Sequence, residues 1–337
     1  MGLATGERYL FQVALVVRRV EGVSRMTAWL KEPSAPGTFQ SVAGRSEWWV
    51  SSFYKFCRLT SEEVQAHQTW FGSYMESSRV LGLVVLAEEG INATVAGERG
   101  AVDVLKTYVE AHFGEVRFKD SVSEMCPFHR VSVDIRREIV ASKNDGLPLP
   151  PGDDHHLSPS EWHAMLAGPN PKTVIDTRNR YETQLGMFEG AVDPDLKSFG
   201  DWGGYLDRAE IPRDQPVMIY CTGGIRCEKA IFELRSRGFE EVYQLRDGIL
   251  GYLEQFPEGK YRGECFVFDD RVALDAHLNP TTKAGICPGC GLPATNKFDC
   301  AWCGSVCFCC DDCRPVWEGV CSKTCRDRIR RHGCPTA

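Results

Sequence analysis

The pattern of apolar and polar positions predicts a mixed α and β region between residues 46 and 142. Thr60-Ser-Glu-Glu63 has the spacing of a capping box, which opens a helix to about Ser78, and helical spacing returns over Glu98–Phe113. Four runs with strand character surround these helices, at Trp48–Phe56, Val80–Leu86, Ala93–Ala96 and Pro127–Val140. The order β-α-β-β-α-β is that of a ferredoxin-like fold.

The pattern changes after residue 160. Ser158-Pro-Ser-Glu-Trp162 starts a helix, and short apolar runs then alternate with helical segments. The predicted strands are Thr173–Asp176, Gly190–Val192, Val217–Tyr220 and Val242–Leu245. This alternation is typical of a parallel α/β sheet, in which reactive groups gather at the carboxyl ends of the strands.

The chain has 337 residues, enough for two or three domains, and is predicted to be an α/β protein. Composition shifts divide it into an extension of unassigned role at 1–45, a ferredoxin-like (acylphosphatase-like) domain at 46–142, a linker at 143–160, a parallel-sheet domain at 161–260, and a Cys-rich segment with a basic tail at 261–337.

Charge and hydropathy limit the partners. The net charge of −7 gives no global nucleic-acid signal, so any such contact must come from local basic groups. Two groups can be phosphate contacts or solvated faces: Arg326, Arg328, Arg330 and Arg331, and Arg117, Lys119, Arg130, Arg136, Arg137 and Lys143. No apolar run is long enough for a membrane span, and the first residues lack a signal peptide, which predicts a cytoplasmic protein.

Eleven of the 16 cysteines lie between Cys287 and Cys334, and most form close-spaced pairs. The pairs are Cys287 with Cys290, Cys300 with Cys303, Cys310 with Cys313, and Cys321 with Cys325. Eight thiolates suffice for one or two structural Zn²⁺ sites, and we expect the first pair to combine with the third and the second with the fourth. Disulfides or unliganded thiols are the alternative, and Cys307, Cys309 and Cys334 are left over.

The segment after the apolar run Val217–Tyr220 predicts a reactive cysteine. Cys221 opens a loop of Thr222, Gly223, Gly224, Ile225 and Arg226, and a helical pattern follows. Inward-pointing amides and a helix N-terminus favour an anion, so they favour the thiolate of Cys221 at the mouth of a half-open pocket. Arg226 can add a guanidinium to the rim. The alternative is a buried structural cysteine.

Other polar residues near predicted strand ends have weaker assignments. Asp176 and Arg178 can be catalytic, but we favour a structural pair that satisfies loop amides. Glu182 can pair with either nearby arginine, Arg178 or Arg180. Cys227 can resolve an oxidised Cys221 or be a small buried side chain. His155 and His156 fall in the linker, where we expect solvent exposure. No nucleotide-cofactor motif is detected.

These residues resemble the rhodanese domain, and more narrowly the tRNA wobble-uridine hydroxylases, which have also been classed as rhodanese-related sulfurtransferases. The matching segments are Ala87–Thr94, Phe118–Ser121, Arg137–Val140, Asp176–Glu182, Leu196–Phe199, Cys221–Ala230 and Arg246–Ile249. The resemblance covers roughly residues 48 to 325. It implies a rhodanese domain at 161–260.

The resemblance also implies an oxidoreductase of class EC 1.14 that forms 5-hydroxyuridine at the tRNA wobble position, with molecular oxygen as co-substrate and Cys221 as nucleophile. The implied partner is a tRNA anticodon loop, not DNA or a membrane, and its bases can stack on aromatic side chains. The candidates for stacking are Trp48, Trp49 and Trp202, although each also suits packing.

Two other functions are compatible with the sequence. The same loop can carry a persulfide on Cys221 in a thiosulfate sulfurtransferase-like enzyme. A zinc-bearing adaptor with a degenerate rhodanese domain is a third hypothesis, but Cys221 and Arg226 are both intact.

Overall fold

The computed structural model describes residues 47–143, 155–317 and 319–333. The predicted extension at 1–45, most of the predicted linker and the leftover Cys334 lie outside the described residues. Among the helices that the structure describes, none combines the length and the apolar character needed to cross a membrane.

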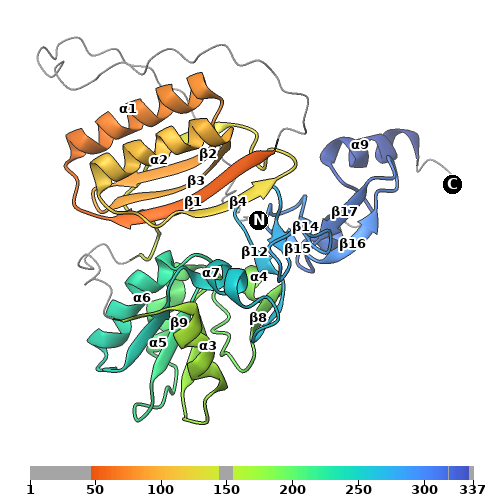
Figure 1. Cartoon of the computed structure of the whole chain (residues 1–337). Helices are drawn as coiled ribbons and strands as arrows, with labels where there is room; N and C mark the ends of the chain where they lie inside the picture. The colour runs from red at the N-terminus through yellow and green to blue at the C-terminus, as the bar shows by residue number, and fades with distance from the viewer. Residues whose placement is uncertain (1–46, 144–154, 318, 334–337) are drawn as a thin grey trace, which may run out of the picture. The chain divides into compact units, whose positions relative to one another are not determined.

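Residues 47–143 form a five-stranded sheet in the order β4-β1-β3-β2-β5, with α1 and α2 on one face (Figure 1). Neighbouring strands are antiparallel except for the parallel pair β2 and β5. The elements are β1 (Trp48–Phe56), α1 (Ser61–Ser78), β2 (Leu81–Ala87), β3 (Gly90–Gly97), α2 (Arg99–Phe113), β4 (Lys119–Ser123) and β5 (Val131–Ile135). The ferredoxin-like expectation is confirmed, and Thr60 caps α1 in the predicted capping box.

The predicted strand at Pro127–Val140 is present as the shorter β5, but it does not close the ferredoxin-like order. The strand that completes the ferredoxin-like order is β4, next to β1, whereas β5 lies at the opposite edge against β2. The sequence of β4, Lys-Asp-Ser-Val-Ser, is polar because β4 is an edge strand with little apolar surface to bury. The apolar run at 131–135 therefore looked like the better candidate.

Alternation along β1 directs neighbouring side chains to opposite faces of the sheet. Phe53 is buried in the core beneath the helices, with Phe71, Leu105 and Val109. Tyr54, the next residue, points to the other face. Lys119 of β4 pairs with Ser52 of β1, so it shares the face of Tyr54, and its Nζ lies 5.0 Å from the Tyr54 ring centroid.

The second sheet is fully parallel, in the order β6-β10-β9-β7, formed by β6 (His156–Leu157), β7 (Thr173–Asp176), β9 (Val217–Tyr220) and β10 (Val242–Leu245). The three predicted strands at β7, β9 and β10 are confirmed at their predicted bounds. The predicted strand Gly190–Val192 was wrong, because Val192 makes only an isolated bridge to Ile175. The chain there forms β8 (Gly186–Phe188), which pairs with β11 (Tyr261–Gly263).

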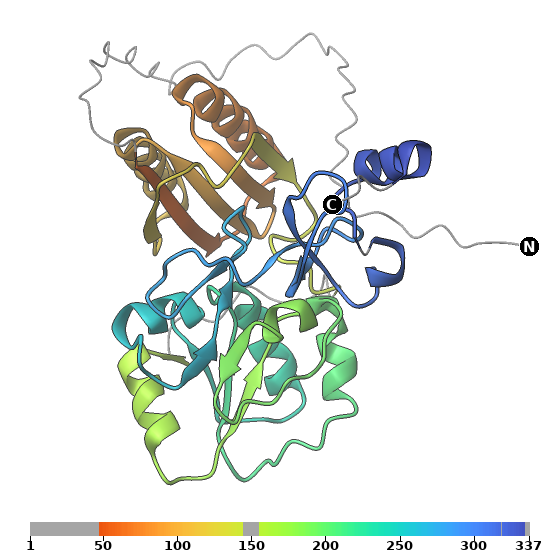
Figure 2. The same ribbon diagram turned by 90° about the vertical axis from the view of Figure 1, so that its right-hand side faces the viewer.

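The remaining elements are short. The helices are α3 (Pro159–Ala167), α4 (Arg180–Thr183), η1 (Phe199–Asp201), α5 (Trp202–Leu206), α6 (Ile225–Ser236), α7 (Gly248–Gln255), α8 (Arg314–Trp317) and α9 (Lys323–His332). The small strands are β12 (Cys265–Phe266), β13 (Ala273–Leu274), β14 (Gly285–Ile286), β15 (Pro293–Ala294), β16 (Asn296–Asp299) and β17 (Val306–Cys309). In the Cys-rich segment, β16 and β17 form a hairpin, and α9 follows them (Figure 2).

The strand pairing of the first sheet can be tested by substitution of Gly90. Its φ is +137°, and an added Cβ would lie 2.0 Å from the carbonyl oxygen of Lys55. Gly90→Ala should therefore lower the free energy of unfolding by about 1–3 kcal/mol or more. Gly72→Ala is the matched control, because Gly72 lies inside α1 with open space around it and the change should stabilise by about 0.5–1 kcal/mol. Urea denaturation measures the free energy of unfolding of both variants. Equal stability of Gly90→Ala and the unmodified protein would contradict the observed pairing of β3 with β1.

Candidate active site and cysteine clusters

The loop between β9 and α6 surrounds Cys221 with hydrogen-bond donors. Its thiol sulfur accepts the N–H of Gly224 at 3.0 Å, and the Arg226 amide also donates to it. Gly224 has a φ of +99°, the left-handed conformation that lets the loop turn into the helix. The loop's carbonyls are satisfied from α7, because the N–H groups of Ile249 and Leu250 donate to the carbonyls of Cys221 and Thr222 at 3.0 and 3.2 Å.

Cys221 is held as a thiolate by these donors. Burial raises the pKa of its thiol, but a hydrogen bond from Cys227, the charge of Arg226 and the loop amides lower it more strongly, to about 6 from the ordinary 9.0. The same burial, together with the neighbouring Cys221 thiolate, raises the pKa of Cys227 well above its usual range. At neutral pH, Cys221 is therefore the ionised member of the pair.

The sequence predicted that Arg226 lies on the rim of the loop. In the structure it does not. Its two terminal nitrogens bind the carboxylate of Glu182 at 2.5 and 2.7 Å, and the side chains of both residues are buried. The expected pairing of Glu182 with Arg178 or Arg180 was wrong, since Arg180 pairs with Asp195 instead. A buried positive charge needs a partner of opposite charge, and Glu182 is that partner for Arg226. The pair therefore holds the Arg226 guanidinium in place beneath the loop.

Asp176 and Arg178 form a second buried pair away from the thiol. The Arg178 guanidinium binds both Asp176 oxygens at 2.7–3.1 Å, and it also donates to the Gly186 carbonyl. Neither side chain is exposed to solvent. These contacts fit the structural role that we favoured.

Cys221 is completely buried, so the expectation of an exposed thiol at a pocket mouth was wrong. Two side chains of the first sheet lie against the loop. Tyr54 Oη lies 2.9 Å from where a Cβ would stand on Gly224, and Lys119 Cε lies 3.8 Å from the same point on Gly223. Burial lowers the pKa of Lys119, while the negative charges of Asp247 and Cys221 oppose that shift.

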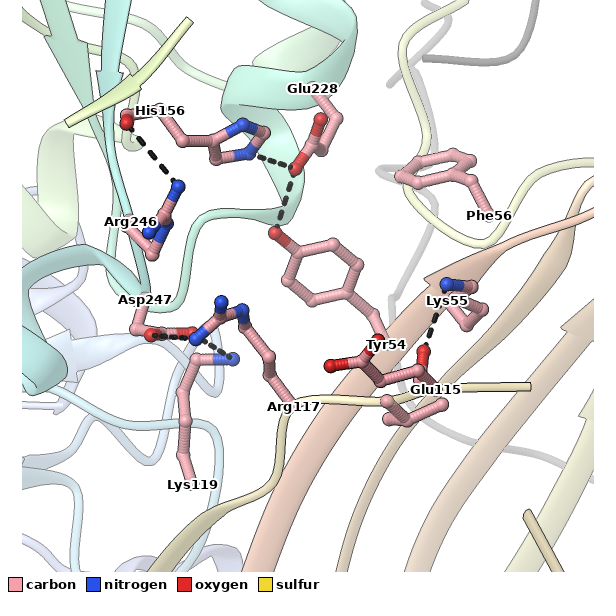
Figure 3. A pocket seen from close by; sticks show the side chains of 11 residues that line it. Tyr54, Lys55, Phe56, Glu115, Arg117, Lys119, His156, Glu228, Arg246 and Asp247 are labelled. Carbon is pink, nitrogen blue, oxygen red and sulfur yellow. Dashed lines mark hydrogen bonds and ion pairs between the residues drawn. The ribbon is translucent and has the colours of Figure 1, made fainter. Parts of the chain in front are cut away.

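A cavity of about 250 Å³ lies beside this loop (Figure 3). Its lining is mostly polar and charged and comes from both sheets: Tyr54, Lys55, Phe56, Glu115, Val116, Arg117, Lys119, His156, Glu228, Arg246 and Asp247. In Figure 3, Tyr54 points across the cavity to Glu228, while Arg117 and Lys119 approach Asp247. The cavity therefore offers several cations next to the thiolate loop.

The linker histidines are not exposed, which corrects the expectation from the sequence. His155 is buried, and the His156 side chain is 8% exposed because β6 joins the parallel sheet beside β10. His156 Nε2 and Tyr54 Oη each lie 2.9 Å from the same oxygen of Glu228. The ligand atoms of His155, His156 and Glu228 lie close enough together to be a possible metal-binding group.

Four residues of this site were not predicted from the sequence: Tyr54, Lys119 as a cavity residue, His156 as a site residue, and Glu228. Two features of the sequence could have indicated some of them. The alternation of β1 directs Tyr54 away from the core of the first sheet, and the Cys-Glu-Lys stretch places Glu228 at the start of α6. Trp202 is buried in the core of the second sheet, so it is excluded as a stacking residue. Trp48 and Trp49 are only partly buried.

The Cys-rich segment gathers eight thiols into two clusters, in the interleaved arrangement expected from the spacing. The clusters are Cys287, Cys290, Cys310 and Cys313, and Cys300, Cys303, Cys321 and Cys325. Sulfur–sulfur separations are 3.7 and 3.8 Å in the first and 3.4 and 3.6 Å in the second. Tetrahedral Zn²⁺ with Zn–S bonds of about 2.3 Å requires about 3.8 Å, so both clusters fit a structural zinc ion.

Cys309 lies beside the first cluster, with its sulfur 3.7 Å from that of Cys287. Cys307 Sγ contacts the Ser305 carbonyl. Of the basic groups, Arg117 and Lys119 line the cavity, whereas Arg326 and Arg328 of α9 lie over Trp317 and Trp302.

Three family models match consecutive parts of the chain: a UPF0176 acylphosphatase-like domain at residues 48–139, a rhodanese-like domain at 158–255 and a rhodanase C-terminal model at 262–326. A Bdellovibrio bacteriovorus protein named tRNA uridine(34) hydroxylase is 40% identical over 85% of this chain and 82% of its own length. A Legionella pneumophila protein of the same name is 38% identical over 68% of this chain and 91% of its own length.

Among solved structures, the rhodanese-like domain of an Anabaena protein is 23% identical, with a TM-score of 0.28, and the match covers 33% of this chain and 80% of that chain.

The ionisation of Cys221 can be tested directly. The thiolate absorbance of the protein, after subtraction of that of Cys221→Ser, should rise as pH increases through about 6. Arg226→Met should move the midpoint upward, because it removes the positive charge and leaves Glu182 unpaired. Arg262→Met, at a 58% exposed position paired with Glu189, should leave it unchanged. A midpoint near 9.0 in the unmodified protein would contradict the stabilisation of the thiolate by the loop amides and Arg226.

Metal content tests the clusters. The protein should carry about two zinc ions per chain, and Cys290→Ser should reduce this to about one because a three-sulfur site binds less tightly. Cys126→Ser, a cysteine outside both clusters, should retain both ions. Elemental analysis of desalted protein gives the count, and an unchanged content in Cys290→Ser would refute the first site.

Proposed function

The chain belongs to the family of tRNA uridine(34) hydroxylases, and we propose that it forms 5-hydroxyuridine at the tRNA wobble position with Cys221 as its nucleophile. The observation that carries the role of Cys221 is the thiolate with a pKa of about 6, held by loop amides next to a cation-lined cavity. A thiolate is the form of cysteine that attacks carbon.

Attack on uridine explains why a thiolate is useful. Carbon 6 of the uracil ring is electrophilic, because it is conjugated with the carbonyl at carbon 4. Addition of the Cys221 thiolate at carbon 6 would place negative charge on carbon 5 and on that carbonyl oxygen. Carbon 5 then becomes electron-rich enough to react with an oxidant, for which we propose molecular oxygen.

Lys119 is the residue best placed to stabilise the developing oxyanion. Its side chain is 12% exposed and lies against the loop, whereas Arg226 is already bound through both terminal nitrogens to Glu182. Arg226 is therefore a positioning residue that lowers the pKa of Cys221. The guanidinium that the sequence placed on the rim of the loop is therefore engaged by Glu182.

The cavity is where we place the wobble nucleotide. A volume of about 250 Å³ admits one unstacked base and excludes a duplex, which fits a single-stranded anticodon loop. Arg117, Lys119 and Arg246 offer positive charge for the flanking phosphates, and Tyr54 offers an aromatic ring. Modification of tRNA also makes the cytoplasm the proposed location.

The two cysteine clusters have a structural part in this proposal. Each would hold one zinc ion, which would stabilise a segment built from two-stranded sheets and short helices that has little core of its own. No step of the hydroxylation uses these sulfurs.

Replacing the nucleophile tests the proposal. Cys221→Ser should reduce the rate of 5-hydroxyuridine formation by about 10³-fold or more, whereas Cys126→Ser should remain active. Nucleoside mass spectrometry of tRNA from a deletion strain that expresses each variant measures the product. Wild-type product levels in the Cys221→Ser strain would refute the mechanism. A stable one-sulfur adduct on Cys221 together with unchanged tRNA would instead support a sulfurtransferase.

A further inference from the structure

Cys227 belongs to the same buried cluster as Cys221, and the proposed mechanism does not use it. It lies in the first turn of α6, where its backbone N–H donates to the Gly224 carbonyl at 3.1 Å, while the Gly224 N–H donates to the Cys221 sulfur at 3.0 Å. The two thiols lie close enough for each to shift the pKa of the other. Its sulfur also lies 3.6 Å from Thr177 Oγ1, which in turn donates to the Tyr220 carbonyl at 2.9 Å. Both sulfurs belong to fully buried residues.

The proposed reaction needs more than a nucleophile. Uridine and molecular oxygen give 5-hydroxyuridine and water only if two electrons and two protons are supplied. Oxidation of two thiols to one disulfide releases these two electrons and two protons. A second thiol in contact with the nucleophile can therefore provide the reducing equivalents inside the site.

We infer that Cys227 is the reducing partner of Cys221, and that each hydroxylation ends with a Cys221–Cys227 disulfide. This inference rests on the proposed function and specifies its electron donor. It also separates the two roles: Cys221 bonds to the substrate, whereas Cys227 reduces the oxygen adduct.

The Cys221 thiolate adds to carbon 6, and carbon 5 bonds to dioxygen and takes one proton to give a hydroperoxide. The Cys227 sulfur attacks the outer oxygen, the O–O bond breaks, and carbon 5 keeps a hydroxyl while Cys227 becomes a sulfenic acid. Loss of the carbon 5 proton expels the Cys221 thiolate and releases 5-hydroxyuridine. Cys221 then attacks the Cys227 sulfenic acid, which gives the disulfide and water.

The local structure permits this bond. Formation of the disulfide requires the two sulfurs to approach to the S–S length of about 2.05 Å. Gly223 has only Lys119 Cε near the position of its absent Cβ, at 3.8 Å, so the loop has room to adjust. A second turnover requires an external dithiol reductant, which exchanges with the disulfide through a mixed disulfide.

A single-turnover experiment tests the inference. Reduced protein is desalted without reductant and mixed with aerated substrate tRNA, and both 5-hydroxyuridine and the Cys221–Cys227 disulfide peptide are quantified. We expect at most about one product per chain, an equal amount of disulfide, and continued turnover only after dithiothreitol is added. Product without the disulfide would overturn the inference.

The variant Cys227→Ser separates the two proposals. It keeps a hydrogen-bond donor but removes the reducing sulfur. The product burst, which is the 5-hydroxyuridine formed per chain without added reductant, should therefore fall at least about 10-fold. The affinity for tRNA should stay within about 2-fold. Cys265→Ser is the control, because it also places a hydroxyl at a fully buried cysteine but outside the pair, and its burst should be retained.

A full burst from Cys227→Ser would refute the role of Cys227 and leave the proposed function of Cys221 intact. Activity in Cys221→Ser would instead refute the proposed function itself. The disulfide measurement on the unmodified protein decides the question even if Cys227→Ser does not fold.

Discussion

A negatively charged sulfur without solvent contact is the constraint on which this site depends. Burial alone would raise the pKa of Cys221, so the thiolate exists only because the chain surrounds it with donors and positive charge. The Gly224 amide, the Cys227 thiol and Arg226 supply them at close range. Each of these groups in turn needs a partner, and this requirement extends the network outward through the fold.

Four consecutive residues at the start of α6 carry most of that network. Arg226 binds Glu182, and Cys227 contacts Cys221 and Thr177. Glu228 accepts from Tyr54, and Lys229 pairs with Glu89 and Glu138 at 2.9 and 2.6 Å. All four residues are buried.

Helical geometry explains why one short stretch reaches so many partners. Successive side chains on a helix point about 100° apart, so four of them project in most directions around the axis. The start of α6 is therefore both the wall of the thiolate site and the attachment point for side chains of the first sheet. Glu89 and Glu138 come from the segments that carry the family resemblance, which gives those segments a structural role: they hold Lys229 beside the reactive loop.

Local patterns in the sequence determined most of the elements. β1, β7, β9 and β10 have the bounds predicted from apolar runs, and Thr60 caps α1 as its capping box predicts. Close Cys spacing likewise predicted the two interleaved clusters, since the members of each pair are only three or four positions apart. Such features depend on residues a few positions apart, which is the range over which side-chain periodicity and capping act.

Only the tertiary structure decided the environment of Cys221. The contact between Tyr54 and Glu228 joins residues 174 positions apart, and His156 reaches the same carboxylate across 72 positions. Burial of the thiol and the pairing of Arg226 with Glu182 depend equally on which faces of distant elements meet. The sequence therefore established that a reactive cysteine loop exists, but packing between distant segments determined which charges surround the sulfur, because local periodicity says which face of an element is polar and not what that face will contact.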